Sequence, residues 1–318
     1  MKVLLDCDLG GGFFGELQAM FPSVDFRRAY TIEEQLQEVG DAEVQIGEIT
    51  RDVYLAARKL RWFQFIGIGF DHIVRNIPEI IEDDVVITNA RQAHAIPMAD
   101  HTFAMMLALA HNLPDLIEDQ RAHRWDTLKY AGRMKELAGT TMGIVAMGDI
   151  GKAIAQRAQG FGMDVYGVDI QAMSPPPGVR EVWGVDRIDD LAAICDWLIV
   201  TAPLTPQTRG MIDRRRLERL KKGAVIIVVS RGSIVEEDAL VDALRCGHVA
   251  GAALDAVAQE PLAPDSPLWD APNILLSPHV SAESPQLWKR RKEIFKENLR
   301  RYLAGEPLLY VCDKRAGF

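Results

Sequence analysis

Two glycines and one aspartate have the residue types and the spacing to hold a nucleotide. Gly148 and Gly151 follow a short apolar run, and Asp169 comes 18 residues after Gly151. A dinucleotide pyrophosphate binds to backbone N–H groups at the N-terminus of a helix, where side chains would hold the phosphates away. Gly148 allows that close approach, and Gly151 lets the helix pack on the preceding strand. The carboxylate of Asp169 could accept the hydrogen bonds of a ribose diol and would repel a 2′-phosphate, which favours NAD over NADP.

The segments around these residues predict the elements that must position them. Residues 143–147 are an apolar run of the length of a buried parallel strand. A helical pattern follows Gly151, and a second predicted strand over residues 164–168 leads into Asp169. Strand, glycine turn, helix, strand and terminal acid together form the dinucleotide-binding unit. An ordinary crossover between two strands is the alternative interpretation.

Ala146 departs from the usual glycine fingerprint, because GxGxxG here reads AxGxxG. Alanine tolerates such a turn only if its φ stays negative. We therefore expect a negative φ at Ala146, with a shifted pyrophosphate or weaker binding as the consequence. A lone glycine triplet is weak evidence, and this one is incomplete.

Composition limits the classes of protein to consider. A chain of 318 residues is too long for one typical domain, so two are expected. A net charge of −9 without a basic stripe argues against a nucleic-acid surface. No segment approaches the roughly 20 apolar residues that span a membrane, and residues 1–6 predict a strand rather than a signal peptide. We expect a cytoplasmic protein with no nucleic-acid or membrane partner. Four cysteines lie far apart without metal-ligand spacing, as is typical of thiols in a reducing compartment: Cys7, Cys195, Cys246 and Cys312.

The first part of the chain alternates predicted strands and helices, which implies a parallel sheet with helices on its faces. The strands are expected at 2–6, 43–47, 62–68 and 85–88, and the helices at 31–39, 51–60 and 74–81. The triplet 10–12 (GGG) predicts a flexible loop, since no Lys-Ser/Thr follows it. Pro97 predicts a break, because the residue before a proline avoids helix; a long helix should then run from 98 to 112 and a second segment from 114 to 124. No metal site is expected from the histidines of this region, which lack zinc spacing: His101, His111 and His123.

The second part of the chain continues the same rhythm. Strands are expected at 197–200, 223–229, 250–254 and 273–276, and helices at 236–244 and 285–303, the last packing back on the first domain. Ligands of parallel sheets lie beyond the carboxyl ends of the strands. The residues that stand at those ends are Gly148, Asp169, Pro203, Arg231, Asp255 and His279.

Several separated motifs together resemble the D-isomer-specific 2-hydroxyacid dehydrogenase family. They are GAVIIVVSRGSIVEEDAL (223–240), LDAVAQEPLAPDSPLWDAPNILLSPHVS (254–281), the nucleotide unit above, TAPLTPQTRGMI (201–212), ITNARQAHAIPMADHTFAMMLALA (87–110) and the ending VCDKRAGF. The resemblance covers essentially the whole chain, with order and spacing kept. It implies two Rossmann-like, doubly wound parallel-sheet domains, one flavodoxin-like and one NAD-binding, with a cleft between them. Residues 1–98 and 285–318 would form the substrate-binding domain, and residues 99–284 the NAD-binding domain.

By this resemblance, Arg231, Glu260 and His279 fall on the catalytic triad. Reduction of a 2-keto acid needs a hydride at carbon and a proton at the developing alkoxide. His279 suits the proton transfer, because imidazole titrates near neutral pH. Glu260, if hydrogen-bonded to the other ring nitrogen, would orient the ring and stabilise the imidazolium. Arg231 would pair with the substrate carboxylate and polarise the carbonyl, which a fork-shaped guanidinium does better than lysine.

The remaining site residues follow from the same resemblance. Asp255 falls where the family holds the nicotinamide carboxamide, and the backbone N–H groups of Ile68 and Gly69 fall where the family holds the substrate carboxylate. The full set of expected cofactor-binding residues is Gly148, Asp149, Ile150, Gly151, Asp169, Thr201, Pro203, Thr208, Val229, Ser230, Asp255 and His279. Two family positions differ here: Val228 stands where asparagine is frequent, and Asp100 where glutamate is.

The resemblance implies an NAD-dependent D-2-hydroxyacid dehydrogenase that works as a 2-keto acid reductase, on glyoxylate or hydroxypyruvate for example. It also implies a homodimer with residues around 100–140 at the interface. An NAD(H)-responsive, corepressor-like binding protein on the same fold is the alternative. A phosphoglycerate-dehydrogenase-like or formate-dehydrogenase-like enzyme is a weaker alternative; the related formate enzymes carry glutamine in place of Glu260. The basic run 289–291 could favour a phosphate, but a solvated helix face is the expectation.

Overall fold

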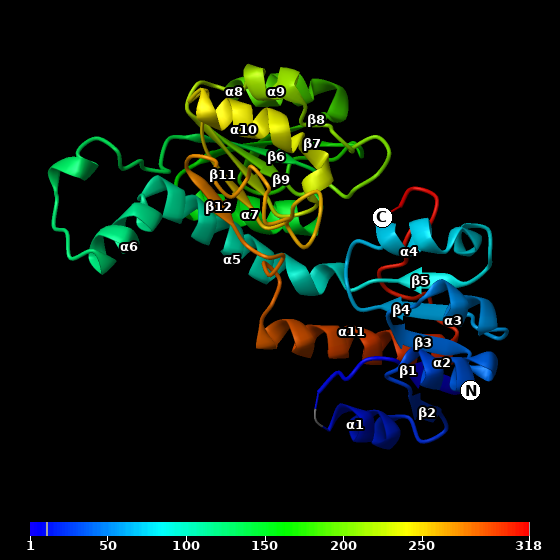
Figure 1. The fold of residues 1–318 in the computed structure, drawn as a ribbon. Helices are drawn as coiled ribbons and strands as arrows, with labels where there is room; N and C mark the ends of the chain where they lie inside the picture. Colours follow the sequence, from blue (N-terminus) through cyan, green and yellow to red (C-terminus); the bar gives the residue numbers. More distant parts are fainter. Residues whose placement is uncertain (11, 318) are drawn as a thin grey trace. The chain divides into compact units, whose positions relative to one another are not determined.

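The chain divides into two compact units in the computed structural model, which describes residues 1–10 and 12–317 (Figure 1). One unit comprises Met1–His94 together with the chain from Ser284 on, and the other comprises Ala95–Glu283. Each unit is built on a parallel β-sheet, which confirms the expected α/β class with two sheets. Gly11 of the glycine triplet and Phe318 of the terminal motif lie outside the described residues.

The first unit contains a five-stranded sheet of order β2-β1-β3-β4-β5. Its strands are β1 (Lys2–Leu5), β2 (Asp25–Arg28), β3 (Val44–Gly47), β4 (Trp62–Phe65) and β5 (Val86–Thr88). Its helices are α1 (Phe13–Met20), α2 (Ile32–Glu38), α3 (Arg51–Ala56), α4 (Asp71–Asn76) and α11 (Pro285–Ala304), with 3-10 turns η1 (Val39–Asp41) and η2 (Pro78–Ile81). The predicted strands are present; α1 and β2 were not predicted from the pattern. β2 lies at the edge of the sheet and buries only Phe26, so it lacks the apolar pattern of the inner strands.

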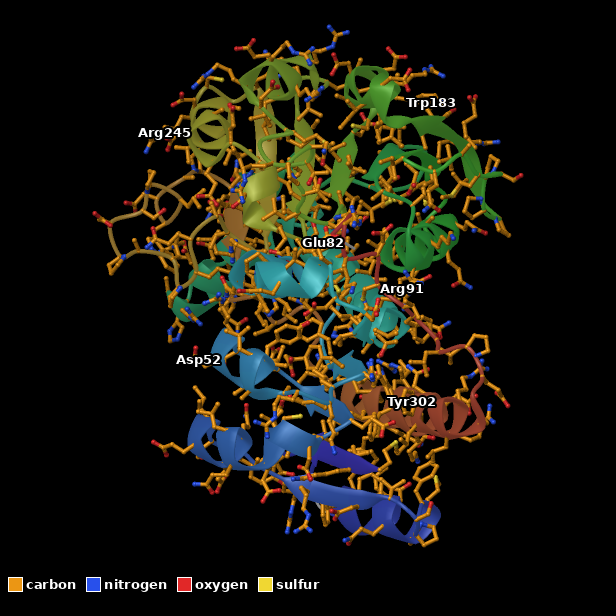
Figure 2. The ribbon with its side chains drawn as sticks, turned by 90° about the vertical axis from the view of Figure 1, so that its right-hand side faces the viewer. Asp52, Glu82, Arg91, Trp183, Arg245 and Tyr302 are labelled. Atoms are coloured by element: carbon orange, nitrogen blue, oxygen red, sulfur yellow. The ribbon has the colours of Figure 1, made fainter. Side chains whose placement is uncertain are left out.

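Helix α11 packs on the five-stranded sheet, as expected. Ser284 caps its N-terminus by accepting the N–H of Leu287, and Pro285 occupies the first turn, where its missing N–H costs nothing. Tyr302, labelled on this helix in Figure 2, stacks on Trp62 of β4 with ring centroids 5.4 Å apart. These contacts join the end of the chain to the sheet formed by its beginning.

Helix α5 (Arg91–Ala110) contradicts the predicted break at Pro97, which lies inside the helix. Proline cannot donate to the carbonyl four residues earlier, which belongs to Ala93. The guanidinium of Arg290 on α11 donates to that carbonyl instead, with Nε 2.9 Å from the oxygen. The neighbouring Arg291 donates to Nε2 of His94 at 2.8 Å. The helix therefore begins seven residues before the predicted start, and Arg290 and Arg291 do not form the solvated face that was expected.

The second unit contains a seven-stranded sheet of order β12-β11-β10-β9-β6-β7-β8. Its strands are β6 (Thr141–Val145), β7 (Asp164–Asp169), β8 (Val179–Gly184), β9 (Trp197–Val200), β10 (Ala224–Val228), β11 (Val249–Leu254) and β12 (Ile274–Leu276). Its other elements are α6 (Leu113–Arg121), α7 (Asp149–Gly160), α8 (Ile188–Ile194), α9 (Arg214–Arg219), α10 (Glu237–Arg245) and the 3-10 turns η3 (Leu128–Tyr130), η4 (Val185–Arg187) and η5 (Gly232–Ile234). Figure 1 shows α8, α9 and α10 on one face of the sheet and α7 on the other, with α6 projecting away from it.

The inner strands of this sheet are buried along their length, as the apolar runs predicted. The unpredicted elements β8, α8 and α9 lie at or near the surface, where β8 buries only Val179. In the part of the chain that the structure describes, no helix is long and apolar enough to cross a membrane.

Candidate active site

The glycine turn between β6 and α7 has the geometry of an anion-binding site. Gly148 is the N-cap of α7, no side chain caps that end, and a Cβ at Gly148 would meet no atom within 4 Å. A Cβ at Gly151, by contrast, would lie 2.5 Å from the carbonyl oxygen of Ala146. The helix therefore packs tightly on the turn while its N-terminus stays open, and Asp149 and Ile150 complete its first turn. These residues fit a dinucleotide pyrophosphate.

The backbone of Ala146 contradicts the prediction of a negative φ, since its φ is +77°. The left-handed region is disfavoured for alanine because its Cβ crowds the backbone. Three hydrogen bonds hold the turn there. The N–H of Ala146 donates to the carbonyl of Val168 at 2.9 Å, and the hydroxyl of Thr201 donates to the carbonyl of Ala146 at 2.7 Å. The N–H of Met147 donates to Asp169 at 2.7 Å. Residues at the ends of neighbouring strands thus hold Ala146 in a backbone conformation that glycine usually adopts.

Asp169 ends β7 beside the glycine turn. One oxygen of its carboxylate accepts the N–H of Met147, and the other accepts the N–H of Gln171 at 2.8 Å. The carboxylate is therefore fixed at the edge of the turn, where the ribose next to a bound pyrophosphate would lie.

Glu260 and His279 form the hydrogen bond that their predicted roles require. Nδ1 of His279 lies 2.8 Å from Oε2 of Glu260, and the other carboxylate oxygen accepts the N–H of Val257 at 3.1 Å. An ionised carboxylate only accepts, so Nδ1 carries the proton of this bond. The ring nitrogen that faces away from Glu260, Nε2, is then the one that could exchange a proton with a substrate.

The turn that carries His279 is organised around Asp255, at the end of β11. The N–H of His279 donates to the Asp255 carbonyl at 2.8 Å, and the side-chain carboxylate accepts the N–H groups of Val280 at 2.9 Å and Ser281 at 3.0 Å. His279 itself has a φ of +56°, a left-handed conformation that a non-glycine residue adopts only when its surroundings hold it. Asp255 thus orients the histidine turn through both its backbone carbonyl and its side chain.

Arg231 follows β10 and caps the 3-10 turn η5. Its Nη1 donates to the carbonyl of Ser230 at 3.1 Å. The next residue, Gly232, has no room for a side chain, since a Cβ there would lie 2.0 Å from the backbone of Val257. The loop of Arg231 therefore packs on the residue whose N–H binds Glu260.

The other expected cofactor residues of this unit stand at the ends of β9 and β10. Thr208 closes the loop after β9 by donating to the carbonyl of Pro203 at 2.7 Å. Ser230, which with Val229 follows β10, donates to the carbonyl of Val200 at 3.2 Å. In the first unit, Ile68 and Gly69 follow β4, and Asn89 donates to the carbonyl of Ile68 at 2.9 Å.

Comparison with known proteins supports the interpretation of these motifs. Residues 103–281 match the model of the D-isomer specific 2-hydroxyacid dehydrogenase, NAD binding domain. The chain belongs to this family. It is 34% identical over 290 residues to a D-3-phosphoglycerate dehydrogenase of Methanocaldococcus jannaschii, which covers 89% of this chain and 54% of that protein. A glyoxylate reductase of Korarchaeum cryptofilum is 32% identical, with 85% of this chain and 82% of the relative covered.

The fold comparison agrees. A D-isomer specific 2-hydroxyacid dehydrogenase from Xanthobacter autotrophicus Py2, solved in complex with NADPH and MES, superposes with a TM-score of 0.84 at 29% identity, covering 100% of this chain and 99% of that one. The chain spans about half the length of the D-3-phosphoglycerate dehydrogenases that it matches from Methanocaldococcus jannaschii, Mycobacterium bovis and Bacillus subtilis.

Two residues near the family's histidine position were not predicted as part of the site. Ser277 lies two residues before His279 and bonds the carboxylate of Asp255 through its hydroxyl. His101, on α5, lies 3.1 Å from the same hydroxyl. The triplet Ser277-Pro278-His279 could have drawn attention to the serine. Nothing in the local sequence pairs it with His101, which lies 176 residues away.

Proposed function

We propose that this family member is an NAD-dependent D-2-hydroxyacid dehydrogenase that acts as a 2-keto acid reductase. The observation that carries the proposal is the hydrogen bond of 2.8 Å between His279 and Glu260, in the same unit as an open glycine turn that fits a dinucleotide. An acid–base pair without that turn, or the turn without the pair, would not favour this chemistry.

The residues supply binding, polarisation and a proton. When bound, the nicotinamide supplies the hydride. Arg231 pairs with the substrate carboxylate and draws electron density from the neighbouring carbonyl. His279 gives the proton of Nε2 to the carbonyl oxygen as it becomes an alkoxide, and Glu260 stabilises the imidazolium beforehand and keeps the ring oriented. The backbone N–H groups of Ile68 and Gly69 are proposed to hold the carboxylate.

NAD is the proposed cofactor in preference to NADP. The Asp169 carboxylate is held by two backbone N–H groups at the end of β7, so it cannot easily turn away from a 2′-phosphate. Residues 170–178 (IQAMSPPPG) contain no lysine or arginine to neutralise such a phosphate. The Xanthobacter neighbour was solved with NADPH, which makes a direct comparison of NADH and NADPH the decisive measurement.

Small 2-keto acids such as glyoxylate or hydroxypyruvate are the proposed substrates, in line with the name of the Korarchaeum relative. The carboxylate of Glu260, where formate enzymes carry glutamine, favours acid–base chemistry on a hydroxy acid. A corepressor-like binding protein on the same fold would keep the triad as well, so turnover on a keto acid is the observation that separates the two functions.

The test is NADH consumption against a panel of 2-keto acids graded by size and charge, with NADPH in parallel. His279→Ala should lose most turnover while still binding NADH, because the residue is expected to move the proton. Glu260→Gln should keep the hydrogen bond but lose the charge. Its turnover should therefore lie between that of His279→Ala and that of the unmodified chain. Unchanged turnover in His279→Ala would contradict the assignment. A flat panel with tight NADH binding would favour the binding-protein alternative.

A homodimer through the arm formed by α6 and η3 is also proposed. Trp125 is 97% exposed and Leu128 is 84% exposed, although the segment is ordered by Asp119, which accepts from Arg124 at 2.6 Å and Lys129 at 2.9 Å. An ordered arm that presents large apolar side chains fits a second copy of this chain. Light scattering should give twice the chain mass, and Trp125→Asp with Leu128→Asp should reduce it to the monomer. A monomer before substitution would contradict the proposal.

A further inference from the structure

His101 contacts Ser277 and Asp255, which hold the turn that carries His279, although it lies far from both in the sequence. Its Nε2 lies 3.1 Å from the hydroxyl oxygen of Ser277 and 3.7 Å from an oxygen of Asp255. Its side chain is 25% exposed, so most of it is buried. All three residues belong to that unit, and α5 holds the histidine on a long helix.

The protons of this network can be assigned. The hydroxyl of Ser277 has one proton, and Asp255 when ionised only accepts, so the serine donates to the carboxylate. The contact between Ser277 and His101 then requires the proton on Nε2 of the imidazole. His101 donates to Ser277, and Ser277 donates to Asp255.

The carboxylate that ends this relay is the one around which the His279 turn is built. Asp255 is 1% exposed and accepts the N–H groups of Val280 and Ser281, the two residues after His279. A buried carboxylate needs several donors to remain ionised. If the donor from Ser277 were lost or turned away, the carboxylate of Asp255 would keep only its two bonds to the N–H groups of the strained turn.

We propose that His101 is a positioning residue for His279: its Nε2–H orients Ser277, which holds Asp255 and through it the turn that carries the imidazole. This inference rests on the proposed role of His279 in proton transfer. A loosened turn displaces the imidazole from the reacting carbonyl, and displacements of about 1 Å can cost about a hundredfold in rate. The loss should appear in kcat, while binding of NADH at the glycine turn is unaffected.

The test compares two substitutions at one position with a matched control. His101→Phe keeps a ring but removes the donor, and kcat should fall about tenfold or more, with the Kd for NADH within about twofold. His101→Gln places an amide N–H near the lost Nε2, so it should recover most of the kcat. His111→Phe, on an exposed residue just after α5, should leave kcat unchanged. An unchanged kcat in His101→Phe, or equal losses in the two variants, would overturn the proposal.

A second substitution and a second measurement distinguish loss of the relay from misfolding and from failure of the proposed function. Ser277→Ala breaks the same relay, so combining it with His101→Phe should add little further loss of kcat; full additivity would overturn the inference. Nitrogen-15 spectra of the histidine rings report on His279 without any substrate. The His279 signal should shift or broaden in His101→Phe and return in His101→Gln. If the unmodified chain reduces no acid in the panel, the proposed function fails, but an unmoved His279 signal is still what would overturn this inference.

Discussion

Two buried aspartates stand at corresponding places in the two sheets, directly after a strand. Asp255 follows β11 of the seven-stranded sheet, and Asp6 follows β1 of the five-stranded sheet. The carboxylate of Asp255 accepts from the backbone of Val280 and Ser281 and from the hydroxyl of Ser277. The carboxylate of Asp6 accepts fewer bonds, from Gln45 at 2.6 Å and from the N–H of Glu48 at 3.0 Å.

The environment of Asp6 changes its chemistry. Burial, and to a smaller extent the nearby charge of Glu48, raise the pKa of Asp6 to about 7, against the lowering effect of the two hydrogen bonds. The protonation of Asp6 therefore changes near neutral pH. The carboxylate of Asp255, by contrast, binds backbone N–H groups of the turn that bears His279. The comparison shows that position at the end of a strand does not determine the role of a buried carboxylate. Its surroundings do: two N–H groups and a hydroxyl bind Asp255, whereas an amide, one N–H group and a nearby carboxylate surround Asp6.

The largest expected effect comes from removing the charge of the Asp255 carboxylate. Asp255→Asn replaces one acceptor oxygen by an NH₂ group, which then faces a backbone N–H or the Ser277 hydroxyl. Loss of a buried, hydrogen-bonded charge should cost about 3 kcal/mol of stability and about a hundredfold in kcat. Urea unfolding and steady-state kinetics measure the two effects. Asp270→Asn, on an exposed residue of the same unit, is the control; equal behaviour of the two variants would contradict the prediction.

The next effect concerns the backbone that packs on Asp6. Gly47 has a φ of +132°, and a Cβ there would lie 1.5 Å from Oδ1 of Asp6. Gly47→Ala must displace the aspartate or the strand end, so it should lower the free energy of unfolding by about 3 kcal/mol or more. At Gly40 the nearest atom to a Cβ would be 3.5 Å away, so Gly40→Ala should cost much less in the same unfolding measurement. Similar losses at the two positions would show that Asp6 is not tightly enclosed.

The charge of Asp6 gives a pH-dependent prediction. Because its folded-state pKa is about 7, above the usual 3.8, the folded state keeps a proton that the unfolded state loses between about pH 4 and 7. Stability of the unmodified chain should fall across that window relative to Asp6→Asn, which cannot ionise. The relative gain of the variant should reach a few kcal/mol at pH 8, at about 1.4 kcal/mol per pKa unit.

Gln45 adds to this expectation. Among the described residues its Oε1 is buried without a hydrogen-bond partner, and the amide of an asparagine at position 6 could donate to it after a flip of the glutamine. Urea unfolding at a series of pH values measures the difference, with Asp8→Asn on the exposed neighbour as control. A difference that does not change between pH 4 and 8 would contradict the assigned protonation of Asp6.

The sequence predicted what depends on local pattern. The inner strands are apolar runs, and Gly148, Gly151 and Asp169 lie at fixed offsets within one strand–helix–strand unit. The edge strand β2 was missed because three of its four residues are exposed and only Phe26 is buried. Such a strand is defined by its neighbour in the sheet and has no pattern of its own.

Features that depend on distant partners could not be predicted. Helix α5 continues through Pro97 because Arg290 binds the carbonyl that proline leaves without its usual donor. His101 meets Ser277 across 176 residues of chain. In both cases the sequence supplied the residue, but its partner was known only once the fold had brought the two together.

Ala146 is the clearest case of a local rule overridden by distant bonds, and it is the counterpart of Gly47 in the other sheet. Both residues have a positive φ just after or at a strand end, but only Gly47 is a glycine. Ala146→Gly should relieve about 1–2 kcal/mol of left-handed strain and lose part of it to the greater freedom of glycine in the unfolded chain, for a net gain of about 0.5–1 kcal/mol. Thermal and urea unfolding of the variant measure it. The gain should be larger when Thr201→Val has removed the hydroxyl that holds the Ala146 carbonyl. A loss of stability in Ala146→Gly would show that the positive φ of Ala146 is not strained. The hydrogen bonds of the turn with Val168, Thr201 and Asp169 would then not be needed to hold it.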